Sequence, residues 1–156
     1  MKYTIWISHN VEDFIFLNGN EWLPKETGGV LMGYCASEFE SVITDIIGPG
    51  PKAFHGNSTF SPDQQYHEDE IKKKYEASER SITYLGDWHT HPNSYPYLSN
   101  QDKSTIKKIA TYDNARLTNP IMLIAAPPKL ELKIWAYEKC RIRSVEIYYK
   151  AEVIYY

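Results

Sequence analysis

The chain has 156 residues and a formal net charge of −3, a length that fits one domain, residues 1–156, with its own core. The acidic balance argues against a nucleic-acid partner, and no stretch resembles a signal peptide or a membrane span, so we expect a cytoplasmic protein with no membrane partner. Cys35 and Cys140 have no metal-binding or redox spacing and predict reduced packing residues. A functional thiol at Cys35 is the alternative.

Strands and helices are mixed in the first half of the chain. The polar sequence Asn18-Gly19-Asn20 is typical of a helix end. Ser61 followed by Pro62 and Gln64 predicts a helix start with Ser61 as N-cap. In chain order, the predicted elements are a strand over residues 3–7, a helix over 10–17, strands over 28–34 and 41–47 that form a hairpin, a short strand over 54–60 and a helix from 61 to about 78.

The second half of the chain is also mixed. The apolar run Ile121–Ala126, ended by two prolines, predicts a buried central strand. The other predicted elements are a strand over residues 81–88, a helix from 100 to about 114, and strands over 130–137 and 142–149. Long helices between strands predict an α/β fold with a mixed or largely antiparallel sheet flanked by helices.

One segment carries a metal-binding pattern. His89-Thr90-His91-Pro92 is followed, after six residues, by Ser99 and by Asp102, which places two imidazoles and a carboxylate within fourteen residues. These are zinc ligands, and three of them leave one coordination position open, as in catalytic zinc sites. Side chains alternate along a strand, so His89 and His91 are predicted to point the same way.

The neighbours of these residues have simpler interpretations as well. Ser99-x-x-Asp102 is also a helix-capping signal, and the two interpretations are compatible. Asp87 falls on the histidine face of the strand, where it is either a partner of the metal ligands or a solvated acid. Trp88 and Thr90 face the other way and are expected to pack in the core.

A catalytic zinc requires a base that takes a proton from the attacking water. The candidate is Glu26, which lies at the mouth of the predicted strand over 28–34, beside two glycines that permit close approach of the backbone. Read alone, Glu26 is an ordinary acid before a strand. In a protein with the zinc pattern described above, the role of base becomes the better interpretation.

These motifs together resemble the JAMM (MPN+) metalloproteases. That family's pattern is a Glu before an apolar strand, then His-x-His-Pro, six residues and Ser-x-x-Asp, and the resemblance spans roughly residues 5–126. It implies a cytidine-deaminase-like α/β fold and a zinc isopeptidase that cleaves ubiquitin-like tails from amines. The match is complete at Glu26, His89, His91, Ser99 and Asp102.

The resemblance also implies roles. His89, His91 and Asp102 would hold one Zn²⁺ per chain, Glu26 would activate water and protonate the departing amine, and the Ser99 hydroxyl would stabilise the oxyanion. The sequence is similar to a compact bacterial branch whose relatives lie beside proteins resembling ubiquitin-activating and ubiquitin-conjugating enzymes in anti-phage operons of the CBASS type. The resemblance to this branch therefore implies that the protein removes a ubiquitin-like or C-terminally conjugated protein from its target.

Other protein classes share parts of this pattern. Within the family, the alternatives are a processing protease for a ubiquitin-like or sulfur-carrier precursor and a metal-free MPN scaffold. The complete ligand set disfavours the scaffold. The chain is short for an amidohydrolase, lacks the Asp-His pair of metallo-β-lactamases and lacks the later Cys-x-x-Cys of deaminases. RadC-like proteins share the histidine segment but lack a counterpart of Glu26.

Overall fold

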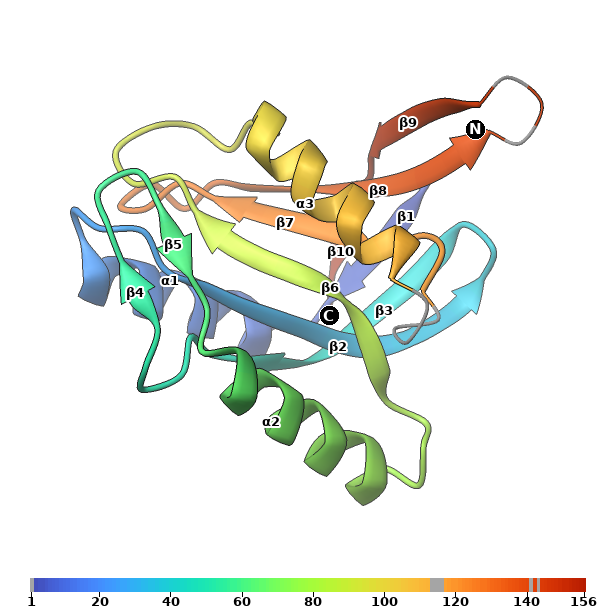
Figure 1. Ribbon diagram of the computed structural model, residues 1–156, viewed down its shortest axis with the longest axis horizontal. Coiled ribbons are helices and arrows are strands. Elements are labelled where there is room, and N and C mark those ends of the chain that lie inside the picture. Colours follow the sequence, from blue (N-terminus) through green and yellow to red (C-terminus); the bar gives the residue numbers. More distant parts are fainter. Residues whose placement is uncertain (1, 113–116, 141, 143) are drawn as a thin grey trace.

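The computed structural model describes residues 2–112, 117–140, 142 and 144–156. Within these ranges the chain forms one eight-stranded mixed sheet, a separate two-stranded hairpin and three helices (Figure 1). The elements are β1 (Thr4–Ile7), α1 (His9–Trp22), β2 (Gly28–Ser37), β3 (Glu40–Ile47), β4 (Phe54–His55), β5 (Phe60–Ser61), α2 (Gln64–Ala77), β6 (Thr83–Thr90), α3 (Asn100–Thr111), β7 (Ile121–Ala125), β8 (Leu132–Cys140), β9 (Val145–Lys150) and β10 (Glu152–Tyr155).

The sheet has the order β10-β1-β3-β2-β6-β7-β8-β9. Strand β1 is parallel to both of its neighbours, β6 is parallel to β7, and the remaining pairs are antiparallel. The predicted α/β class with a mixed sheet is confirmed, and so is the β2–β3 hairpin. Strand β10 was not predicted, because its partner β1 lies almost a full chain length away in sequence.

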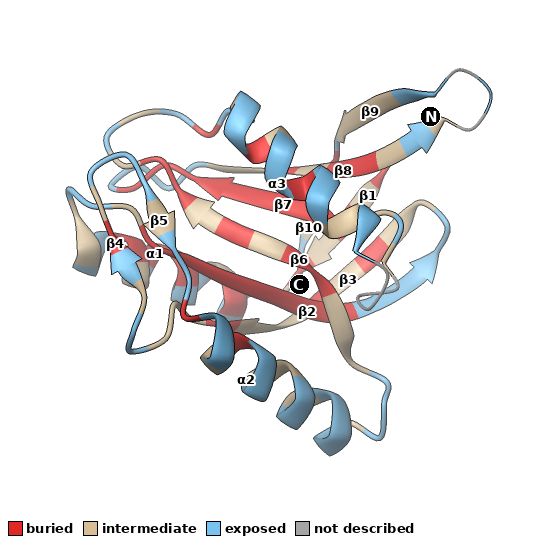
Figure 2. Cartoon of the chain, in the orientation of Figure 1, coloured by how far each residue is buried: buried red, intermediate tan, exposed pale blue. Residues whose placement is uncertain are grey.

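The helices cover opposite faces of the sheet. Helix α1 packs Val11, Ile15 and Phe16 against one face, where the largest apolar cluster lies. Helices α2 and α3 cover the other face (Figure 1), α2 beside a cluster around Met32 and α3 beside one around Ile106. The central strands β2, β6 and β7 are largely buried between these layers (Figure 2). No helix in the described ranges is long and apolar enough to cross a membrane.

The predicted end of the first helix at Asn18-Gly19-Asn20 is wrong, since α1 continues to Trp22. Gly19 is buried, and a Cβ there would lie 3.0 Å from Pro127 Cγ. Asn18 Oδ1 accepts a hydrogen bond from Thr27 Oγ1 at 2.9 Å. Small and polar residues therefore serve close packing against the rest of the fold here, and they do not terminate the helix.

Residues 54–64 also differ from the prediction. The single strand predicted over 54–60 is two short antiparallel strands, β4 and β5. Helix α2 is capped by Asp63 and not by Ser61, which ends β5. Asp63 accepts hydrogen bonds from the backbone N–H groups of Tyr66 and Lys52, so its carboxylate joins the helix start to the preceding loop.

The other elements agree with prediction apart from their ends. Strand β6 begins and ends two residues later than predicted, β8 extends to Cys140, and β9 begins at Val145 because Ile142 lies in a turn. Ser99 caps α3 as predicted. The predicted end of this helix, near residue 114, lies outside the described residues.

Candidate metal centre

Strand β6 carries the two histidines to the site. Its side chains alternate, so Trp88 and Thr90 are fully buried on the α1 side, while His89 lies on the opposite side. His91 follows the end of the strand, where its backbone N–H donates to the Ala125 carbonyl at 2.8 Å. This hydrogen bond continues the β6–β7 pairing by one residue and keeps the second imidazole on the same face as the first.

The start of α3 supplies the carboxylate. Ser99 Oγ accepts the Asp102 N–H at 3.1 Å, and Asp102 Oδ2 accepts the Ser99 N–H at 2.9 Å, which is a capping box. The cap fixes Asp102, which is buried, with its carboxylate toward the histidines. Asp102 can therefore complete the capping box and still direct its carboxylate toward the two histidines.

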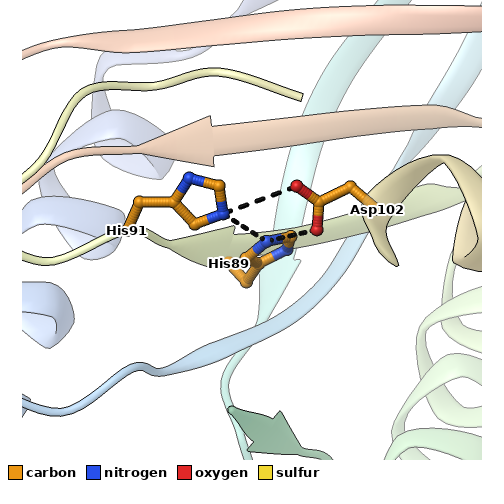
Figure 3. Close-up of side chains that lie close together, drawn as sticks. All are labelled: His89, His91 and Asp102. Carbon is orange, nitrogen blue, oxygen red and sulfur yellow. Dashed lines mark hydrogen bonds and ion pairs between the residues drawn. The ribbon is translucent and has the colours of Figure 1, made fainter. Parts of the chain in front are cut away.

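The three side chains converge, as Figure 3 shows. His89 Nε2 lies 2.8 Å from Asp102 Oδ1, His91 Nε2 lies 3.4 Å from Asp102 Oδ2, and the two Nε2 atoms are 3.2 Å apart. A tetrahedral zinc with bonds of about 2.0–2.1 Å requires ligand atoms roughly 3.4 Å apart. The donor set and its dimensions therefore fit a zinc ion held by His89, His91 and Asp102.

The electrostatics favour an ionised ligand. Burial opposes the charge on Asp102, but hydrogen bonds with His89 and His91 outweigh burial and hold the pKa of Asp102 well below its usual range. This low pKa keeps Asp102 a carboxylate at neutral pH, as metal coordination requires. His91 Nδ1, on the other side of the second imidazole, is buried without a hydrogen-bond partner among the described residues.

Glu26 lies at the edge of the same cavity, immediately before β2. Burial raises its pKa, whereas the nearby imidazoles of His89 and His91 oppose this rise. Gly28 pairs with His89 across the β2–β6 ladder, and a Cβ at Gly28 would lie 2.5 Å from the Trp88 carbonyl oxygen. A glycine is therefore required for β2 to bring Glu26 to the histidines.

Sequence reasoning missed the residues that hold Glu26. The Glu26 N–H donates to the Gly56 carbonyl at 2.8 Å, and the Glu26 carbonyl lies 2.9 Å from His55 Nδ1. The His55 ring stacks on Trp22, with ring centroids 3.3 Å apart. Burial lowers the pKa of His55, which favours the neutral imidazole that donates this hydrogen bond. No short motif marks these contacts, because they join α1, β2 and the β4–β5 hairpin.

A groove of about 1040 Å³ extends from these residues. Residues of α2, α3, β2, β6 and the β4–β5 hairpin line it. Figure 1 shows the two helices on the same face of the sheet. Glu26, His89, His91, Ser99 and Asp102 all line it, so the structure brings every predicted site residue to one cavity. Asp87 lines it too, and it accepts a hydrogen bond from the Tyr84 hydroxyl at 2.7 Å. Burial raises the pKa of Asp87.

The candidate metal ligands and Glu26, which line one groove, indicate the class of protein. A His-x-His pair at the end of a strand and a carboxylate at a helix start, in one groove with a glutamate, are the groups that a metal-dependent hydrolase requires. Residues 9–138 match the family of prokaryotic homologs of the JAB domain, and the chain belongs to this family. It is a metal-dependent peptidase or isopeptidase, as the sequence predicted.

Individual proteins agree with this assignment. The chain is 36% identical over 125 residues to the probable metalloprotease y4qB of Sinorhizobium fredii, covering 80% of this chain and 76% of the relative. It is 29% identical over 121 residues to a CD-NTase/cGAS isopeptidase of Escherichia coli, covering 77% and 71%. The fold matches the solution structure of a Desulfitobacterium hafniense protein, with a TM-score of 0.66, 15% identity and coverage of 97% and 92%.

Proposed function

We propose that this protein is a zinc isopeptidase that cleaves the bond between the C-terminal glycine of a conjugated protein and an amine. The observation that carries the proposal is the convergence of three zinc-type ligand atoms, from His89, His91 and Asp102, in the groove that also contains Glu26. The metal would leave one position open, which is the arrangement of catalytic zinc sites.

Each protein group has a role in this chemistry. A bound zinc ion supplies Lewis acidity and lowers the pKa of a coordinated water to about 7. Glu26 accepts the proton of the attacking water and later donates it to the departing amine. The Ser99 hydroxyl donates a hydrogen bond to the developing oxyanion. Ser99 Oγ accepts the Asp102 N–H, so its own hydrogen stays free for this role.

The substrate class is inferred from the relatives. The E. coli relative is named for isopeptidase action on CD-NTase/cGAS, which supports a C-terminally conjugated protein as the substrate here. We infer that the chain acts in anti-phage defence, alongside activating- and conjugating-enzyme-like proteins of its operon. The relative from S. fredii is named only as a metalloprotease. This name leaves the type of bond open, so processing of a linear ubiquitin-like precursor is the second candidate.

The test is a cleavage assay with two matched peptides. Both end in the same glycine, joined in one to a lysine Nε and in the other to a backbone amine. The zinc-loaded protein should cleave the isopeptide faster, chelation should abolish cleavage, and added zinc should restore it. Preferential cleavage of the linear peptide would favour the processing role. A protein that takes up zinc and cleaves neither peptide would contradict both candidates.

A further inference from the structure

His55 is the only buried residue of the β4–β5 hairpin. The other residues from 54 to 61, all of which the structure describes, are exposed or half-buried. Burial of an imidazole costs free energy unless its polar atoms have partners, and an apolar side chain would anchor the hairpin at a lower cost. A histidine at this position is therefore expected to make a specific polar contact.

The polar contact is with the backbone of Glu26. His55 Nδ1 lies 2.9 Å from the Glu26 carbonyl oxygen. A carbonyl oxygen only accepts hydrogen bonds, so Nδ1 carries the hydrogen. Burial lowers the pKa of His55, which favours the neutral imidazole. The ring is therefore a neutral donor directed at the peptide group that joins Glu26 to Thr27.

Two aromatic rings fix the plane of this imidazole. The Trp22 ring, at the end of α1, stacks on the His55 ring with centroids 3.3 Å apart and an interplanar angle of 6°. The Phe60 ring, on β5, lies with its centroid 5.4 Å from that of His55. Contact with both rings restricts rotation of the imidazole, so its Nδ1–H keeps its direction toward Glu26.

The peptide group between Glu26 and Thr27 is held at both ends. Its carbonyl accepts from His55, and its N–H donates to Thr90 Oγ1 at 3.0 Å. Thr90 is fully buried and lies between the two candidate histidine ligands in sequence. The N–H of Glu26 itself donates to the Gly56 carbonyl at 2.8 Å. The candidate base is thus tied to the histidine strand on one side and to the hairpin on the other.

The position of the Glu26 backbone matters because its carboxylate has to reach the attacking water. A glutamate side chain is flexible, so a shift of its backbone also moves the carboxylate relative to the metal ligands. A misplacement of about 1 Å can reduce a rate roughly a hundredfold. The hydrogen bond from His55 restrains this backbone on the side that the sheet does not hold.

We propose that His55 is a positioning residue, whose Nδ1–H holds the Glu26 backbone so that the Glu26 carboxylate meets the water at the metal centre. The proposal rests on the isopeptidase function above and adds a residue that acts through the base without touching the substrate.

The test compares two substitutions that each keep one property of the imidazole. His55→Phe keeps a ring that can stack on Trp22 and removes the donor. His55→Asn removes the ring and keeps an N–H close to the position of Nδ1. With zinc-loaded protein and the isopeptide substrate, His55→Phe should lower kcat about ten- to a hundredfold, with KM and zinc content unchanged. His55→Asn should retain kcat within about threefold.

Two further variants serve as controls. His9→Phe makes the same exchange at an exposed histidine and should leave kcat unchanged. Trp22→Leu removes the stacked ring but keeps the donor, so it should lower kcat less than His55→Phe does. A role of His55 in packing alone predicts the reverse order, with His55→Phe close to the unmodified protein and His55→Asn impaired. That order, or equal kcat in the two His55 variants, would overturn the proposal.

NMR of the metal-free protein provides a readout that does not depend on turnover. Long-range ¹H–¹⁵N spectra of the unmodified protein should show the hydrogen of the neutral His55 ring on Nδ1. Amide hydrogen exchange at Glu26 should be about three- to tenfold faster in His55→Phe, because one of the two contacts with the hairpin is lost. His55→Asn should keep the exchange rate of the unmodified protein.

The two readouts distinguish failure of the function from failure of the positioning role. If neither peptide is cleaved but the NMR results are as expected, His55 holds Glu26 and the isopeptidase function fails. If the isopeptide is cleaved while Nδ1 carries no hydrogen, or while both His55 variants have equal kcat, the function holds and the positioning role fails. If there is no cleavage and no change in exchange at Glu26, both fail.

Discussion

The two faces of strand β6 have different roles: one packs in the core and the other borders the groove. On the α1 side, Trp88 and Thr90 are buried in the core, and the Trp88 Nε1–H donates to the Ile47 carbonyl at 3.1 Å. On the other side, Asp87 and His89 border the groove. The same eight residues thus contribute one set of side chains to the core and another to the groove with the candidate metal centre. Substitutions on the two faces should therefore have separable effects on stability and activity.

The largest expected effect is on the groove face. His89→Ala should abolish zinc binding and reduce turnover to the assay background, because two ligands do not hold a catalytic zinc tightly. Metal analysis of the purified variant and the isopeptide assay measure both consequences.

His9→Ala is the matched control, since His9 is an exposed histidine at the start of α1. It should keep the zinc content and turnover of the unmodified protein. Full turnover by His89→Ala after chelator treatment would show that the histidine does not hold a catalytic metal.

On the core face, Trp88→Ala should lower the free energy of unfolding by about 3–5 kcal/mol, the usual range for an aromatic residue removed from a core. The fraction that remains folded should still bind zinc, since Trp88 points away from the ligands. Denaturant unfolding of the metal-free protein measures the loss. Leu17→Ala, at a largely exposed position of α1, should change stability by less than about 0.5 kcal/mol. Equal losses in both variants would contradict the assigned core.

Ser99 combines both kinds of effect in one residue. Ser99→Ala should cost about 1 kcal/mol of stability through the lost cap, and roughly a hundredfold in kcat through the lost oxyanion donor. Ser99→Asn retains a capping side chain and should restore the stability without restoring kcat. Recovery of kcat together with stability in Ser99→Asn would show that Ser99 serves only as a cap.

The smallest expected effect concerns the charge on Glu26 in the metal-free protein. Burial raises its pKa, so the folded state favours the protonated carboxyl. The stability that this provides is present below the unfolded pKa of about 4.3 and is lost as the pH rises through the higher folded pKa. Metal-free Glu26→Gln should therefore be slightly more stable than the unmodified protein at pH 7. Thermal unfolding at pH 4 and pH 7 tests this, and a larger gain at pH 4 would contradict it.

Much of the metal centre could be predicted because it is local. His89, His91 and Asp102 lie on one strand, one turn and the next helix, so alternation and capping rules place them together. Glu26 comes from a distant part of the chain, so no local rule places it beside the histidines; it was chosen as a candidate because a catalytic zinc requires a base, and the resemblance to a family supported that choice. Tertiary pairings without a local pattern escaped prediction, as strand β10 and the contact of His55 with Glu26 show.

A bulge in β6 at Leu85, where the β2–β6 ladder shifts register between Leu31 and Met32, also depends on tertiary pairing and could not be predicted from the sequence. Alternation alone places Tyr84 and Asp87 on opposite faces of β6, and the register shift against β2 reverses this. The shift depends on how β6 fits between β2 and β7, which a single strand sequence does not encode. The helix end predicted at Gly19 failed for a related reason, because the glycine is used for packing against Pro127.

The central claim is that Glu26 acts as a base and not as a metal ligand, beside a centre formed by His89, His91 and Asp102. The direct measurement is zinc content and turnover of Glu26→Gln, prepared in parallel with the unmodified protein. We expect one zinc per chain in both and a loss of about 10²–10⁴-fold in kcat in the variant. Turnover close to that of the unmodified protein, or loss of the zinc, would contradict the account.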